Sequence, residues 1–119
     1  MIEKFERYKF LEFFDYERII EEDALDLEYV INLEEGFIFK LHVQIFDGYA
    51  SITLNHNKLD VFIFNIAVNC VRTISCDESF LYFYKEDKEG FLYKEQKLIE
   101  PFLIVRIKPS VSFVSDVGF

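Results

Sequence analysis

The sequence predicts a mainly β fold, an antiparallel sandwich or a partly open barrel of about seven strands with a short N-terminal helix as one reading. Three observations support this prediction. Apolar and polar residues alternate with period two over several runs, turn-forming residues recur at short spacing, and 15 Phe and 7 Tyr supply the material for a core. At 119 residues, the chain is expected to form a single domain, 1–119.

The clearest strands lie between positions 36 and 68. In the run 37–45 every odd position is apolar, whereas the even positions include Lys40, His42 and Gln44. A pleated strand sends alternate side chains to opposite faces, so this run has one wholly apolar face. Asp47-Gly48 predicts a two-residue turn, because both residues tolerate positive φ. A second strand follows over 50–55, a turn over 56–58 and a third strand over 59–68.

The secondary structure of the first 36 residues is less clear from the sequence. Residues 2–14 have apolar side chains near helical spacing, and an early strand is the competing reading. Residues 16–24 form either a helical turn or an acidic loop. Apolar and polar residues alternate over 27–33, which predicts a strand. Residues 34–36 are predicted to form the turn that leads into the next strand.

Further short strands are predicted after residue 69. They cover 71–76, after a bend or bulge at Asn69, then 80–84, 91–93, 102–107 and a last run from Val111 to Val117. Turns are predicted at 77–79 and 87–90, and a polar loop at 94–100. The aromatic run 80–84 allows two readings. It is either a buried sheet face or a binding surface that presents Tyr82 and Tyr84.

The net charge of −9 is concentrated in one segment. Residues 15–35 contain nine acids and one base, Arg18, while the remainder of the chain is close to neutral. Such a surface repels nucleic acid and anionic membrane and attracts a basic protein. We therefore predict that 15–35 face a partner, with Glu21, Glu22, Asp23 and Asp26 at the centre. A solvated acidic loop is the alternative.

The sequence contains no specific catalytic, metal or cofactor motif. There is no Gly-x-Ser-x-Gly elbow, the acids lack calcium-loop spacing, and four glycines form no phosphate loop. We expect a non-enzymatic protein without a cofactor. The alternative is a small-ligand-binding barrel or enzyme with a deep pocket that holds His42 or another titratable group with a perturbed pKa.

The predicted location is the cytoplasm. Charges at the N-terminus argue against a secretion signal, and no apolar run is long enough to span a bilayer. Cys70 and Cys76 are too few for a disulfide framework and are read as reduced thiols. We make no prediction of the oligomeric state.

Four strand patterns resemble those of small bacterial immunity proteins, which neutralise toxins of polymorphic or contact-dependent systems. The patterns lie at 27–33 (LEYVINL), 39–43 (FKLHV), 59–64 (LDVFIF) and 103–109 (LIVRIKP). The resemblance implies an inhibitor that docks on a toxin and blocks its active site, and it fixes no binding residues. The alternative partner is a nucleic-acid-handling enzyme whose basic groove the acidic segment occupies, as a phage-type inhibitor would.

Overall fold

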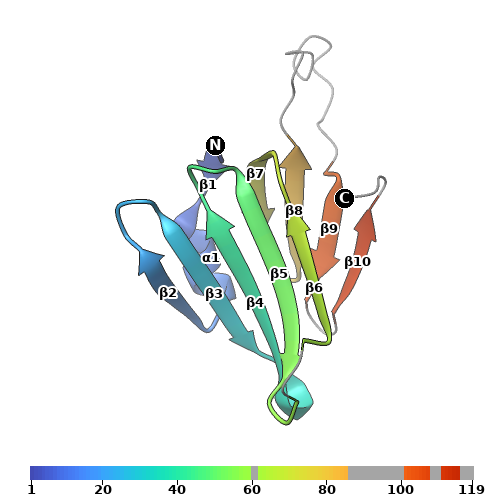
Figure 1. Ribbon diagram of the computed structural model, residues 1–119. Helices are drawn as coiled ribbons and strands as arrows, with labels where there is room; N and C mark the ends of the chain where they lie inside the picture. The colour runs from blue at the N-terminus through green and yellow to red at the C-terminus, as the bar shows by residue number, and fades with distance from the viewer. Residues whose placement is uncertain (60–61, 86–100, 108–110, 116–119) are drawn as a thin grey trace.

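Two five-stranded sheets face each other in the computed structural model, which describes residues 1–59, 62–85, 101–107 and 111–115. The front sheet in Figure 1 has the strand order β2-β3-β4-β5-β6, and the back sheet has the order β1-β7-β8-β9-β10. With one short helix near the N-terminus, this open β sandwich confirms the predicted fold class.

The front sheet is an antiparallel meander. Its strands are β2 (Tyr16–Glu21), β3 (Asp26–Asn32), β4 (Phe37–Gln44), β5 (Tyr49–His56) and β6 (Phe64–Val68), with a 3₁₀ turn, η1 (Glu34–Gly36), between β3 and β4. The alternation predicted for β4 is confirmed, because Phe39, Leu41 and Val43 are fully buried. The third predicted strand is also present, but it begins at Phe64 rather than at Leu59.

Two predictions for the front sheet are wrong. Residues 16–21 form strand β2 instead of a helical turn or an acidic loop, because they pair along β3 from Tyr16↔Val30 to Ile19↔Leu27. A bulge between Ile19 and Glu21 breaks the alternation that would have revealed this strand. Asp47-Gly48 does not form a two-residue turn either. Residues 45–48 form a four-residue loop, since Gln44 pairs with Tyr49.

The N-terminal segment contains both a strand and a helix, the two structures that the sequence allowed for residues 2–14. Strand β1 (Lys4–Phe5) pairs parallel to β7, and helix α1 (Arg7–Phe13) follows. Phe10 and Phe13 of α1 are buried, and the Phe10 ring stacks on Phe5 with centroids 4.3 Å apart. The apolar side of the helix thus closes one side of the core between the two sheets (Figure 1).

The back sheet continues with β7 (Val71–Cys76), β8 (Phe80–Lys85), β9 (Leu103–Arg106) and β10 (Ser112–Ser115), and these four strands pair antiparallel with one another. The strands predicted over 71–76, 80–84 and 102–107 are confirmed, as is the turn at 77–79. A bend at Cys70, which has φ 59°, takes the chain from the front sheet to the back sheet. The turn, strand and loop predicted between 87 and 100, and Val117, lie outside the described residues.

One hydrophobic core fills the space between the sheets. Tyr29, Phe39 and Leu41 of the front sheet and Leu81 and Phe83 of the back sheet are all 0% exposed. Because Leu81 and Phe83 point inward, Phe80, Tyr82 and Tyr84 lie on the outer face and are only partly buried. The reading of these three aromatic residues as a buried face is therefore wrong.

Candidate functional site

The β2–β3 turn presents three of the four predicted acids to solvent. Glu21 ends β2, and Glu22 and Asp23 lie in the turn; all three are exposed. The Leu25 N–H donates a 3.1 Å hydrogen bond to the Glu22 carbonyl, and Leu25 adopts a left-handed φ of 48°. This local hydrogen bond closes the turn on which Glu22 and Asp23 are exposed.

A fourth acid joins this turn from the β4–β5 loop. The Ile45 N–H donates to the Leu25 carbonyl at 3.3 Å, which holds the loop against the turn. Asp47 of that loop is exposed, and the neighbouring Phe46 is 53% exposed. We call Glu21, Glu22, Asp23 and Asp47 the acidic rim; it lies at the upper end of the front sheet in Figure 1.

Asp26, the remaining predicted acid, has a different environment. Its side chain is 18% exposed, and its carboxylate contacts His42 Nε2 and accepts a 3.4 Å hydrogen bond from Gln44 Nε2. Ser51 lies opposite His42 in the register of β4 and β5, but no hydrogen bond joins the two described side chains. The Asp26–His42 pair therefore lies beside a serine without forming a Ser–His–Asp relay.

Several other acids of residues 15–35 are held within the fold. Glu17 accepts hydrogen bonds from Arg7 Nε at 2.7 Å and from the Tyr29 hydroxyl at 2.6 Å. The hydrogen bond from Arg7 lowers the pKa of Glu17 below its usual value. Glu28 forms an ion pair with Arg18 at 3.1 Å. These carboxylates are bound to neighbouring side chains of the fold.

The last acids of this segment lie at the opposite end of the sheet. Glu34 and Glu35 occupy η1, which Figure 1 draws at the bottom of the front sheet, away from the β2–β3 turn. The segment 15–35 thus divides among the rim, the internal pairs and η1, and forms no single ridge of carboxylates.

The two predicted tyrosines lie in the other sheet. Tyr82 and Tyr84 are on the outer face of β8, and the Tyr82 hydroxyl donates a 2.6 Å hydrogen bond to Asp77 of the β7–β8 turn. This hydrogen bond raises the pKa of Tyr82 to about 12. The structure does not bring Tyr82 and Tyr84 together with the acidic rim.

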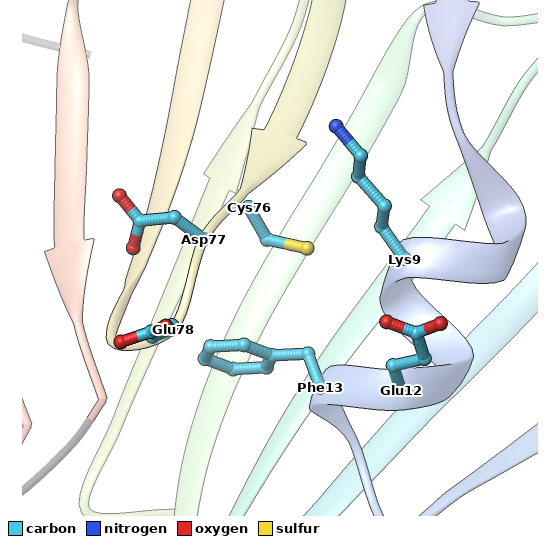
Figure 2. Close-up of a pocket in the computed structure, with 6 residues that line it drawn as sticks. All are labelled: Lys9, Glu12, Phe13, Cys76, Asp77 and Glu78. Atoms are coloured by element: carbon cyan, nitrogen blue, oxygen red, sulfur yellow. The ribbon is translucent and has the colours of Figure 1, made fainter.

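A groove of about 520 Å³ lies between α1 and the β7–β8 turn (Figure 2). It is lined by Lys9, Glu12, Phe13, Cys76, Asp77 and Glu78. Burial raises the pKa of the Cys76 thiol to about 11, so this thiol is protonated at neutral pH and is a poor nucleophile. Burial alone would raise the pKa of Asp77, but hydrogen bonds from Tyr82, Ser79 and Phe80 lower it below its usual value.

The groove does not contain His42, but two of its lining residues, Cys76 and Asp77, have shifted pKa values, which is the other feature that the alternative of an enzyme or ligand-binding barrel expects. In the described ranges, no three His, Cys, Asp or Glu side chains come together as a metal-binding group. No helical segment that the structure describes has the length and hydrophobicity needed to span a bilayer.

Sequence reasoning missed Asp47 and the groove for different reasons. Asp47 could have been placed near Glu22, because strands 27–33 and 37–45 were expected to form a hairpin. In a hairpin, the segment before the first strand and the loop after the second lie at the same end. The groove depends on how α1 packs beside β7, and no local pattern of residues encodes that contact.

Comparison with solved structures finds a similar fold in a "Contact-dependent growth inhibition toxin - immunity protein complex from Klebsiella pneumoniae 342". The match covers 96% of this chain and 95% of the matched chain, with a TM-score of 0.65 and 18% sequence identity. The resemblance to contact-dependent toxin–immunity systems is thus confirmed at the level of the fold. No protein-family model and no curated protein matches the sequence.

Proposed function

We propose that this protein is a non-catalytic inhibitor of immunity type, which docks through its acidic rim on a basic toxin. The observation that carries the proposal is the fold that this chain shares, over nearly the full length of both proteins, with a chain of a toxin–immunity complex. The proposal places the protein in the cytoplasm, where an incoming toxin would act.

Charge favours the immunity role over the toxin role. A toxin that cleaves nucleic acid needs basic side chains to bind phosphates, whereas this chain has a net charge of −9. A protein that covers a basic cleft benefits from the opposite charge, because complementary surfaces speed association and exclude other partners.

The acidic rim is the part of the surface best suited to that contact. None of its four carboxylates has an ion-pair partner among the described residues, so all of them remain available to basic side chains. The exposed Phe46 beside Asp47 supplies an aromatic side chain that can be buried at the centre of an interface. Gathering like charges contributes nothing to fold stability, since even paired surface charges are worth only about 0–1 kcal/mol.

The geometry gives less support to a phage-type mimic of nucleic acid. Such a mimic requires carboxylates spaced evenly along one ridge, as phosphates are along a strand. Here Glu17, Asp26 and Glu28 have partners within the fold, and Glu34 and Glu35 lie at the far end of the sheet.

The test is neutralisation of a candidate toxin, chosen as the product of a gene next to the one that encodes this chain. Purified protein should form a complex with that toxin and abolish its activity with an endpoint at one inhibitor per toxin. A catalytic antidote would instead neutralise toxin at well below equimolar amounts, and an unrelated protein would form no complex. Either of these two results would overturn the proposal.

A further inference from the structure

Strand β6 forms the outer edge of the front sheet. Among the described residues, β6 (Phe64–Val68) pairs with β5 alone, from Ala50↔Val68 to Leu54↔Phe64. In an edge strand, alternate backbone N–H and C=O groups point away from the sheet and offer a template for another strand.

The two edges of this sheet differ in how they are protected. Strand β2 carries Glu17, Arg18 and Glu21 and has a bulge before its end, and both features discourage edge pairing. In contrast, the sequence from Phe62 to Val71 contains no charged residue, no proline and no glycine. The β6 edge therefore lacks the features with which proteins usually prevent association between sheets.

Exposed and partly buried apolar side chains lie on β6 and just before it. Phe62 and Ile63, just before β6, are 57% and 45% exposed. Phe64 and Ile66 on the inner face are only partly buried, although both pack against the core. The inner apolar face of the sheet thus continues up to its last strand, where a further strand would complete its burial.

We propose that β6 pairs antiparallel with β6 of a second copy of this chain, centred on Ile66. In this register Phe64 lies opposite Val68 of the second copy, and Asn65 lies opposite its Ala67. Because the pairing preserves the alternation of side chains, inner apolar residues meet inner apolar residues and outer residues meet outer residues. The two front sheets then form one continuous sheet with a two-fold axis.

The distribution of charge favours a second copy of this chain, rather than a basic partner, as the strand that pairs with β6. β6 has no carboxylate to attract basic side chains, and the acidic rim belongs to other elements. Two chains with a net charge of −9 repel one another over most of their surfaces, and an uncharged strand is where they can approach. The inference is independent of the proposed function, because dimerisation is measured without any toxin.

Sedimentation velocity of the full chain, from about 10 µM to about 500 µM, tests the pairing. Wild-type protein should dimerise as its concentration rises. The double variant Asn65→Lys/Ala67→Lys places like charges directly opposite across the two-fold axis and should weaken dimerisation by more than about tenfold. The matched control Tyr16→Lys/Ile20→Lys adds the same charge to β2 and should dimerise as wild type does. Circular dichroism checks that each variant is folded.

Disulfide trapping tests the register. In a Cys70→Ser background, a mixture of Asn65→Cys and Ala67→Cys proteins should cross-link, because paired residues in a sheet bring Cα atoms to about 4.5–5.5 Å. In a dimer of either variant alone, the new cysteine does not lie opposite the same cysteine of the second copy, so neither variant alone should cross-link. A wild-type monomer at the highest concentration, or a dimer that the β6 lysines leave unchanged, would overturn the pairing. A lysine-sensitive dimer that fails to cross-link in the mixture would overturn the register.

Discussion

Glu17 is the residue that connects α1 to the front sheet. Its carboxylate binds Arg7 of the helix and the hydroxyl of Tyr29, which is 0% exposed. Without a charged acceptor, the buried Tyr29 hydroxyl and the Arg7 guanidinium lose their best partner. Glu17 therefore stabilises the packing of the N-terminal segment, although the sequence assigns it to the acidic surface.

We expect Glu17→Gln to lower the free energy of unfolding by about 2 kcal/mol at pH 7, because hydrogen bonds to a charged group are lost. The folded-state pKa of Glu17 is lowered, so its contribution is present above the unfolded-state pKa and is lost as the pH falls through the folded-state value. The difference between the variant and wild type should shrink below about pH 4. Urea unfolding at several pH values measures this. Equal loss in Glu22→Gln, which removes an exposed charge, would contradict the assignment.

The two thiols should differ in reactivity. Burial raises the pKa of Cys76 to about 11, whereas Cys70 is exposed at the bend between the sheets. Alkylation requires an accessible thiolate, so iodoacetamide at pH 8 should label Cys70 well before Cys76 in the folded protein. Mass spectrometry of digests taken over time resolves the two sites. Equal labelling rates would show that Cys76 is not protected, and labelling in urea provides the unfolded control.

At the scale of elements, the sequence predicted strands where one face is buried and alternation is regular. This holds for β3, β4 and β5. It missed β2, because this edge strand has exposed Ile19 and Ile20 side by side and a bulge between Ile19 and Glu21. Pairing with β3 determines the conformation of residues 16–21, and a contact of that kind is not written in a local pattern.

The β4–β5 loop depends on Gly48. This residue has φ +64°, and a Cβ there would lie 3.3 Å from the Met1 nitrogen and from the Val71 carbonyl oxygen. Gly48→Ala should lower the free energy of unfolding by about 1–2 kcal/mol, the cost of a left-handed backbone with a side chain. The close contacts with two backbone atoms add to this cost, because backbone atoms cannot move aside as a flexible side chain can. Thermal unfolding measures the loss, and a Gly48→Ala variant as stable as wild type would contradict this explanation.

At the scale of the whole molecule, the charge excess was predictable but its arrangement was not. The acids of 15–35 stand out in the sequence, whereas their division among the rim, η1 and the internal pairs arises from pairing across the sheet and to α1. Asp26 turns toward His42, while Asp47 joins the rim from another loop. Tyr82 and Tyr84 remain a predicted binding surface in the other sheet, separate from the rim.

The central claim, that the acidic rim docks on a basic toxin, is tested most directly by stopped-flow association at low and high salt. The rim variant Glu21→Gln/Glu22→Gln/Asp23→Asn/Asp47→Asn removes the rim charge and leaves the Asp26–His42 contact intact. The control Glu12→Gln/Glu34→Gln/Glu35→Gln/Glu78→Gln removes the same charge from exposed positions elsewhere. At about 50 mM salt the rim variant should associate roughly tenfold more slowly than wild type, and the control should differ little. At about 500 mM salt the difference should largely disappear. Equal rates for the rim variant and the control at both salt concentrations would contradict the claim.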